Sequence, residues 1–476
     1  MGIPWFAKTS MEEYGGWIVI AQQPGGPRGS PQRQPTPDTV YENPSPKPGE
    51  EVDEERDTKV KVVSLSHPDT LKATSKLFDR PQKLFANFAD FFGWKSIQFR
   101  NGEDGRLVRD RLDPYFGHEA NSKNITHFNE LAKTTLKDWI EIARENEGGE
   151  RTPVVAQELM LNYAFHTTAK IIFGDYFNQK PDTLLQFIQD YNTVRTYLCF
   201  YSDKCMKELE NRLHSPPSSP DSDAGRKYLQ AVDRTKTPME RIMEERKRLE
   251  SAQVLLRDRF AIDEICDLAQ ADPEEVFSLS ITYIVAGFHT TGYALSWLLY
   301  YLCKHPEVKE RMVREIEEVL GDDDPWPDAL PQLKYCRQVL DETMRCSALA
   351  TYAARFSPNT DINIFNYRIP KNTPLLQALG CTMHNPQLWK DPLKFDPDRF
   401  HPTNRYNPLS FPIFGFAGKR KCPGYAFFYV ESLCMICFLL RPLDFALADP
   451  DQEIIPKYGF VTQPSQDVLL HVSLRN

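Results

Sequence analysis

The amino-acid sequence predicts a mainly α-helical protein with a minor β portion. Long segments in the middle of the chain repeat apolar residues at helical spacing, whereas segments that alternate as strands do are short and few. The chain has 476 residues, of which 41% are hydrophobic, so it can enclose one large core. Its formal net charge of -9 argues against a nucleic-acid-binding protein, which usually carries a basic field.

The N-terminal segment, residues 1–58, is predicted to be disordered. Residues 22–58 are rich in proline, glycine and acidic residues and cannot bury enough apolar surface to offset the entropy lost on ordering. The apolar segment at 17–21 is too short to span a bilayer, and no secretory signal is visible. The folded domain is therefore expected to span residues 59–476, beginning with a strand-like alternation over 59–66.

The middle of the chain is predicted to consist mainly of helices, with turns and short strands between and after them. Residues 214–225 are rich in proline and serine and predict a surface loop. Strand-like segments come after the last central helix, at 362–370 and 373–379. The predicted central helices cover 127–147, 234–260, 272–321 with a break at His305-Pro306 and an end at Gly321, and 330–346.

The segment 276–303 has two interpretations. It contains no Asp, Glu, Lys or Arg, and its length alone would suit a transmembrane helix. However, Gly287, His289, Thr290 and Thr291 lie at its middle, and polar groups there are costly in lipid. A helix through the centre of a large core is also apolar on all sides. We favour the buried helix over the membrane span.

Cys422 differs from the other nine cysteines, most of which lie in apolar, helix-like segments typical of reduced intracellular proteins. It precedes Pro423, which suits the first position of a helix predicted over 425–440. No histidine follows nearby to act as a base, and one thiolate cannot hold zinc, but it can be the sole protein ligand of a haem iron. A cysteine buried in a turn is the alternative that this loop alone leaves open. A helix N-terminus and adjacent cations would favour the thiolate form, and the cations here are Lys419, Arg420 and Lys421.

Four motifs lie in order along the chain: the segment AGFHTT at 286–291, the segment ETMR at 342–345, the segment FDPDRF at 395–400, and Gly418, Arg420 and Gly424 around Cys422. With these motifs the sequence resembles the haem-thiolate cytochromes P-450. The resemblance is clear from about residue 272 to the end and extends back to about 59. The stretches LKYCRQVLDETMR and KFDPDRF resemble in particular the family-twenty branch of the animal enzymes.

The resemblance implies a cytochrome P-450 fold, a single large helical domain with small β-sheets, whose N-terminal part is incomplete in this chain. It implies a monooxygenase that inserts one atom of O2 into an apolar organic substrate with electrons from NADPH. The implied partner is NADPH-cytochrome P-450 reductase, and Lys419 and Lys421 would help to dock it. The alternatives are a haem-thiolate enzyme that rearranges peroxides and a haem-binding relative with little or no turnover.

The resemblance also implies a location at the cytosolic face of the endoplasmic reticulum membrane. No membrane anchor is visible in this chain, so a cytoplasmic location is the alternative. Peripheral contact with a membrane is a separate expectation.

The implied cofactor is haem b, held through Cys422 as the proximal thiolate ligand. Arg420 would pair with a haem propionate, since a fixed guanidinium suits a carboxylate. Arg109 and Arg355 are further propionate candidates, although a surface arginine is the alternative for each. Phe416 and Gly424 complete the expected haem contacts.

Two further groups of residues take roles by resemblance. Thr290 and its neighbour His289 would deliver protons on the oxygen side, although His289 alternatively only packs against its surroundings. The second group would be structural, since residues one helical turn apart can meet, and would hold the cysteine loop through a buried ionic cluster of Glu342, Arg345 and Arg399.

Three features depart from the family pattern. The glycine and phenylalanine before the cysteine stand in the order Gly415-Phe416, which displaces the expected aromatic shield. Gly105 occupies the place of a tryptophan four before Arg109, so one haem contact is expected to be missing. The anchor, the proline-rich hinge and much of the first β-sheet are also expected to be missing.

Overall fold

The computed structural model describes most of the chain from residue 62 onward. The described residues are 17–20, 62–146, 151–174, 189–190, 193, 223–251, 259–365, 367–415, 418–459 and 461–475. Apart from 17–20 and 223–225, the segments predicted to be disordered at 1–58 and to form a loop at 214–225 lie outside this range. The described part is mainly α-helical with small β-sheets, as the sequence predicts.

Helix α10 (Pro273–Lys304) runs through the middle of the molecule and packs along α6 (Ala156–Phe173). Asp272 caps its N-terminus by accepting a hydrogen bond from the Glu274 N–H. The two helices approach closely, because a Cβ added at Gly287 would lie 2.4 Å from the Thr168 side chain. Most of residues 276–303 are buried in the protein, and no described helix is long and apolar enough to cross a membrane.

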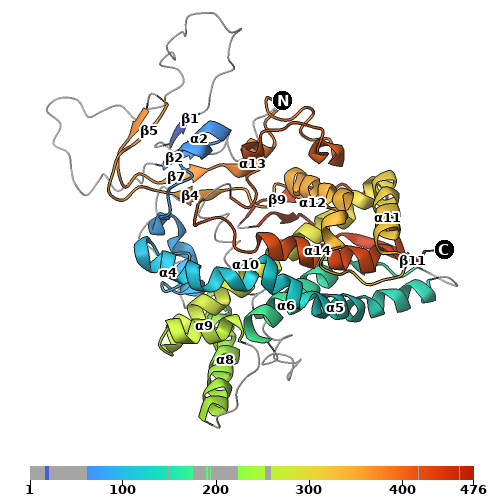
Figure 1. The fold of residues 1–476 in the computed structure, drawn as a ribbon, viewed down its shortest axis with the longest axis horizontal. Coiled ribbons are helices and arrows are strands. Elements are labelled where there is room, and N and C mark those ends of the chain that lie inside the picture. The colour runs from blue at the N-terminus through green and yellow to red at the C-terminus, as the bar shows by residue number, and fades with distance from the viewer. Residues whose placement is uncertain are drawn as a thin grey trace, which may run out of the picture.

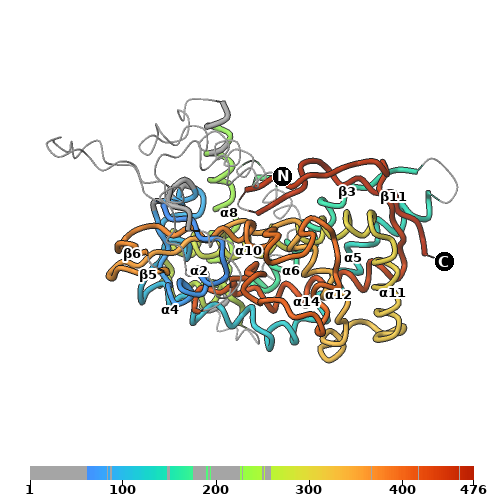
Figure 2. Tube along the Cα trace, turned by 90° about the horizontal axis from the view of Figure 1, so that it is seen from above, coloured from blue at the N-terminus to red at the C-terminus, as the bar shows by residue number. Residues whose placement is uncertain are grey.

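A second pair of helices, α14 (Tyr425–Leu440) and α5 (His118–Glu145), packs beside the first. The helix predicted over 127–147 corresponds to α5, which starts nine residues earlier, at His118. Helix α14 agrees with the prediction at both ends. Figures 1 and 2 place these long helices at the centre and towards the end of the molecule that carries α11.

The remaining helices surround this core. The helix predicted over 234–260 overlaps α8, which starts earlier, at Asp223, and ends at Ser251. The next helix, α9, starts at Ala261. The predicted break at His305-Pro306 is confirmed, and Gly321 ends the following helix with a φ of 53°. The helices are α2 (Pro68–Ala73), α3 (Ala89–Phe92), α4 (Gly102–Leu112), α8 (Asp223–Ser251), α9 (Ala261–Leu268), α11 (Pro306–Leu320), α12 (Lys334–Ser347) and α13 (Leu379–Met383).

A four-stranded sheet lies at one end of the molecule, beside α2 (Figures 1 and 2). Its order is β1 (Trp17–Ile20), β2 (Val62–Leu65), β7 (Leu375–Gln377) and β4 (Ala353–Arg355). The first three strands are parallel, and β4 is antiparallel to β7. The prediction of disorder is therefore wrong for 17–20, because four apolar residues pair with the edge of β2. The first sheet is accordingly more complete than the sequence predicted.

Three smaller sheets complete the fold. At the opposite end from the four-stranded sheet, the C-terminal strand pairs with two others in antiparallel fashion (Figure 1). The strands of the smaller sheets are β3 (Val154–Val155), β11 (Leu469–Leu474) and β8 (Leu443–Leu447) in one, β5 (Ile362–Ile364) and β6 (Tyr367–Ile369) in the second, and β9 (Pro456–Lys457) and β10 (Gln463–Pro464) in the third.

Candidate functional site

The loop before α14 presents Cys422. The Cys422 N–H donates to the carbonyl oxygen of Phe414 at 2.8 Å, which closes the loop on itself. Gly415 and Gly418 have φ values of 72° and 76°, a conformation that L side chains rarely adopt. A Cβ at Gly418 would also lie 2.8 Å from the carbonyl oxygen of Ser75. The glycines therefore let the loop hold an exposed cysteine at the start of a buried helix.

The start of α14 agrees with the sequence prediction, but the ionisation of Cys422 does not. The N-cap of α14 is Gly424, so Pro423 lies directly before the cap and the helix begins at Tyr425. Cys422 retains exposed surface, but the surrounding protein desolvates its sulfur and raises the pKa of the thiol. The hydrogen bond from Gly424 and the charges of Arg109 and Lys421 lower this pKa without offsetting the burial. The predicted stabilisation of a thiolate by the helix and the cations alone is therefore wrong.

One face of α10 has exposed surface within the otherwise enclosed helix. Between Val276 and Tyr300, every residue is buried except Ala286, Gly287 and Thr290. Thr290 Oγ1 donates to the Ala286 carbonyl oxygen at 2.7 Å, so its hydroxyl lies on that same face. Because one side of α10 is exposed at these three positions, another molecule can bind beside the helix there.

His289 lies on a different side of α10 from this face. Its ring is buried and packs edge-on against Tyr293, with the ring centroids 4.7 Å apart. The Tyr293 hydroxyl in turn hydrogen-bonds Gln463 Oε1 at 2.9 Å. His289 is therefore adjacent to Thr290 in the chain, but its ring packs against an aromatic side chain on another side of α10.

Three arginines predicted from sequence meet near Cys422. Arg420 from the loop, Arg109 from α4 and Arg355 from β4 are all buried, which excludes the surface alternative for the last two. Arg420 donates to the carbonyl oxygens of Phe78 at 3.1 Å and Ile97 at 2.9 Å, and to that of Arg100. Burial and the charges of Arg109 and Arg355 lower the pKa of Arg420 to about 9. Burial and Arg109 lower that of Arg355 to about 10.

Arg80 lies close to these three arginines and was not predicted from the sequence. Burial and the charges of Arg420, Arg355 and Arg109 hold its pKa well below the usual range. Arg80 belongs to none of the quoted motifs and follows Asp79 in a loop, so its spacing gave no signal.

The arginine cluster of Arg80, Arg109, Arg355 and Arg420 carries more positive than negative charge. Among the described residues, two carboxylates lie close to it. Asp113 accepts from Arg109 Nε at 2.6 and 2.8 Å, and Asp79 favours the charged form of Arg420. Four guanidinium groups against two carboxylates leave a formal excess of two positive charges in a mostly buried place. Such an arrangement favours a bound dianion.

The structure also brings together Glu342, Arg345 and Arg399. Glu342 and Arg345 are fully buried on α12, and Arg345 Nε donates to Glu342 Oε2 at 2.7 Å. Arg399 Nε reaches Glu342 Oε1 at 3.3 Å. The Asp396 N–H donates to the same oxygen at 2.8 Å, so the cluster ties α12 to the segment 390–399. Phe416, the remaining predicted contact, lies outside the described residues.

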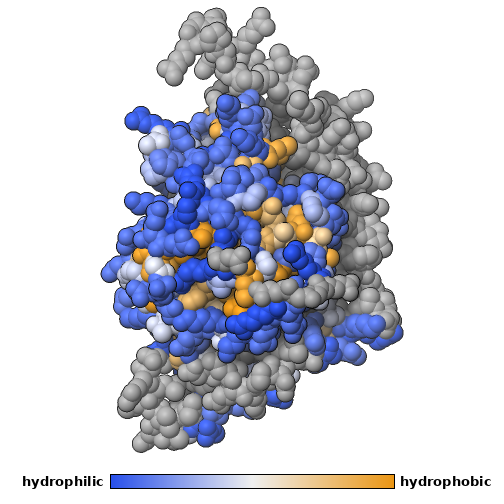
Figure 3. Space-filling view, turned by 90° about the vertical axis from the view of Figure 1, so that its right-hand side faces the viewer, coloured by the Kyte–Doolittle hydropathy of each residue, from blue (hydrophilic) through white to orange (hydrophobic). Residues whose placement is uncertain are grey.

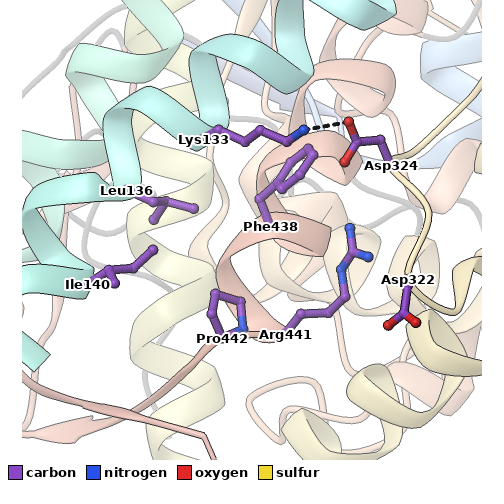
Figure 4. Close-up of a pocket in the computed structure, with 8 residues that line it drawn as sticks. All are labelled: Lys133, Leu136, Ile140, Asp322, Asp324, Phe438, Arg441 and Pro442. Carbon is purple, nitrogen blue, oxygen red and sulfur yellow. Dashed lines mark hydrogen bonds and ion pairs between the residues drawn. The ribbon is translucent and has the colours of Figure 1, made fainter. Parts of the chain in front are cut away.

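A separate surface hollow lies at the other end of α14 (Figure 4). Its volume is about 450 Å³, and Lys133 forms an ion pair with Asp324 at its edge, 2.5 Å apart. The 16 residues of α14 separate it from Cys422 by roughly 24 Å. It is lined by Lys133, Leu136, Ile140, Asp322, Asp324, Phe438, Arg441 and Pro442. Figure 3 shows that apolar side chains gather in the middle of the face that carries α11, inside a hydrophilic rim.

The fold and this site define a class of protein. The family model described as Cytochrome P450 matches residues 53–471, and the chain therefore belongs to the cytochrome P-450 family. It is 28% identical to Cytochrome P450 20A1 of Bos taurus over 421 residues, covering 87% of this chain and 83% of the relative. It is 26% identical to Cytochrome P450 20A1 of Homo sapiens, with the same coverage. The predicted resemblance to the animal family-twenty branch is thus confirmed.

Solved structures agree on the fold. The heme domain of cytochrome P450DA superposes with a TM-score of 0.70, at 20% identity, over 87% of this chain and 88% of that chain. A triple mutant of the same domain gives a TM-score of 0.71.

The family and the fold imply a haem bound through a cysteine thiolate. The described residues fit such a group. Cys422 is an exposed residue at the start of α14, and the excess of two positive charges in the arginine cluster matches the two propionates of a haem. A metal cation at the sulfur would also reverse the unfavourable effect of burial on the thiolate.

Proposed function

We propose that this protein is a monooxygenase that inserts one atom of O2 into an apolar organic substrate with electrons derived from NADPH. The observation that carries the proposal is Cys422, an exposed residue, beside a mostly buried arginine cluster with two excess positive charges. The catalytic unit is the proposed haem domain, residues 59–476. Haem b bound through Cys422 would supply the activation of oxygen, since thiolate donation favours O–O cleavage.

The loop residues would hold the sulfur in place. The Cys422 N–H is bound to the Phe414 carbonyl oxygen, and the Gly424 N–H hydrogen-bonds the sulfur. The Phe414 ring packs against Tyr425 and Phe428, with centroids 5.1 and 5.5 Å away. This packing fixes the residue that accepts the hydrogen bond of the Cys422 N–H. Phe416 and Gly424 remain proposed haem contacts.

The arginine cluster would bind the propionates. Arg109, Arg355 and Arg420 come from three different elements, so their convergence orients the cofactor as well as neutralising it. Arg80 would contribute a fourth positive charge to the same propionate site.

Thr290 would hold a proton at Oγ1 on the accessible face of α10. Its present bond to the Ala286 carbonyl oxygen is local, and the hydroxyl can instead donate to a group beside the helix. His289 would support proton supply through its imidazole nitrogens, from the buried side where its ring packs on Tyr293. Glu342, Arg345 and Arg399 would act structurally, by fixing the segment that leads to the cysteine loop.

NADPH-cytochrome P-450 reductase is the proposed electron donor. Lys419 and Lys421 are exposed beside Cys422, where an acidic partner could dock. Lys419 already pairs with Asp110 at 2.6 Å, so docking would have to exchange this ion pair. The proposed location is the cytosolic face of the endoplasmic reticulum, with peripheral membrane contact, and the cytoplasm is the alternative.

A second candidate is the rearrangement of peroxides without a reductase. His289 favours it, because this position next to Thr290 is usually acidic in the family. A haem-binding protein with little or no turnover is the third candidate.

Spectroscopy and turnover separate these readings. Reduced, CO-bound protein should show the thiolate-specific Soret band, and Cys422→Ala should lose it while the control Cys381→Ala keeps it. NADPH-dependent turnover with added reductase supports the monooxygenase, and turnover with peroxides alone supports the second candidate. Haem-loaded protein without either activity would leave the third, and wild-type protein that holds no haem would overturn all of them.

A further inference from the structure

Tyr283 carries a buried hydroxyl that has no partner in the part of the chain that the structure describes. The residue lies in the N-terminal half of α10 and is 6% exposed. Its hydroxyl has no hydrogen-bond partner among the described residues. Other tyrosines of the core differ, since the Tyr163 hydroxyl donates to the Glu431 carbonyl oxygen at 3.0 Å. Buried hydroxyls are rarely left unbonded, because they lose their bonds to water on burial.

The ring of Tyr283 is fixed by stacking. It lies parallel to the ring of Phe116, with the centroids 5.3 Å apart and an interplanar angle of 8°. Phe116 in turn packs edge-on against Phe427 of α14 at 6.0 Å. The Tyr283 ring is therefore held in one place beside the turn at Asp113–Phe116, which itself packs on α14.

That place borders the arginine cluster. The charges of Asp113, Arg109, Arg420 and Arg80 all act on the ionisation of Tyr283, and burial raises its pKa above the usual range. The hydroxyl therefore keeps its proton and can donate. A guanidinium offers no acceptor, and the Asp113 carboxylate is engaged by Arg109 at 2.6 Å. The acceptor that suits this hydroxyl is an anion bound among the arginines.

We propose that Tyr283 donates a hydrogen bond to a propionate of the haem held by the arginine cluster. The inference rests on the proposed haem site and deepens it. A neutral donor recognises the carboxylate without adding to the repulsion among four guanidinium groups.

This donor would replace a contact expected to be missing at Gly105. No side chain fits there, because an added Cβ would lie 2.6 Å from the Arg100 carbonyl oxygen. Tyr283 reaches the same region from α10 instead of α4.

Tyr283→Phe tests the proposal in the haem-loaded full chain, since it removes the hydroxyl and keeps the ring stacked on Phe116. The first measurement is the rate of haem transfer to excess apomyoglobin, and the second is the propionate bending band in the resonance Raman spectrum. We expect haem loss to be about tenfold faster, as for a hydrogen bond to a charged acceptor, and the band to shift. The control is Tyr300→Phe in the same helix, whose hydroxyl lies 3.4 Å from Glu453 Oε2 and accepts from the Ile454 N–H.

An unchanged rate and an unchanged band in Tyr283→Phe would overturn this inference. The proposed function would survive that result, because the CO-bound spectrum and its loss in Cys422→Ala test the cysteine and not the tyrosine. A wild-type protein without haem would instead overturn both. Equal acceleration of haem loss in Tyr283→Phe and Tyr300→Phe, with no shift of the band, would show a general loss of packing and also contradict the proposal.

Discussion

Arg109 donates a hydrogen bond through Nη2 to the carbonyl oxygen of Lys421 at 2.5 Å, across 312 positions of sequence. The same guanidinium binds Asp113 through Nε. One side chain of α4 therefore holds the backbone of the residue directly before Cys422, and the position of the sulfur depends on an element far away in the chain.

Replacing Arg109 with Gln should loosen this connection. The variant loses the bond to Lys421 and leaves Asp113 without its cation, so we expect the free energy of unfolding to fall by about 2 kcal/mol. Urea titration measures it, and Arg144→Gln on the exposed side of α5 is the control. A variant as stable as wild type would show that α4 does not support the cysteine loop.

Glu342→Gln should be among the most destabilising single substitutions. It leaves Arg345 fully buried without the carboxylate that pairs with it, and breaking a buried pair by removing one partner costs about 3–5 kcal/mol. The matched control is Glu310→Gln, whose carboxylate pairs with Arg475 at 2.9 Å on the surface and should contribute about 0–1 kcal/mol. Similar unfolding curves for the two variants would contradict a structural role for the buried cluster.

Thr290→Val should separate proton supply from haem binding. The valine keeps the helix but removes the hydroxyl on the accessible face, so product formation should fall by about tenfold or more with the CO-bound spectrum intact. Ser296→Ala is the control, because its hydroxyl donates to the Gly292 carbonyl oxygen at 2.7 Å in the same helical geometry but is buried. If both variants lose product equally, Thr290 has no special role.

The stability of the protein should depend on pH through Asp341. Burial raises the pKa of this carboxyl to about 7, although the hydroxyl of Tyr429 and the charge of Arg337 act in the opposite direction. The unfolded chain loses this proton near pH 4, whereas the folded protein keeps it until about pH 7. Folding therefore favours the protonated form, and this residue makes stability fall as pH rises from about 4 to about 7.

Asp341→Asn tests this pH dependence by removing the titrating group. Urea titrations between pH 5 and 8 should show a smaller decline for the variant than for wild type, with parallel curves above pH 7. A wild-type curve that instead rises relative to the variant over this window would reverse the predicted sign.

Much of the site could be predicted from sequence because its residues lie in short, ordered motifs. Glu342 and Arg345 are one helical turn apart, and their pairing follows from helix geometry alone. Cys422 could be found from the glycines around it, since the loop needs their positive φ values.

Other features could not be predicted because they depend on contacts between distant segments. Arg80 and Tyr283 have no motif, and only the folded chain brings them to the arginine cluster. The pKa of Cys422 was predicted in the wrong direction because sequence shows the nearby cations but not the desolvation. Trp17–Ile20 was placed in a disordered segment because four residues carry too little pattern without the strand they pair with.

The arginine cluster also links the lifetime of this protein in a cell to the supply of its cofactor. Without an anion, the four guanidinium groups repel one another in a place where water screens them poorly. A ligand that binds only the folded chain shifts the folding equilibrium toward it, and newly made protein that lacks the ligand is exposed to proteases for longer. The steady-state amount of the protein should therefore fall when haem synthesis is limited, even if its messenger RNA is unchanged.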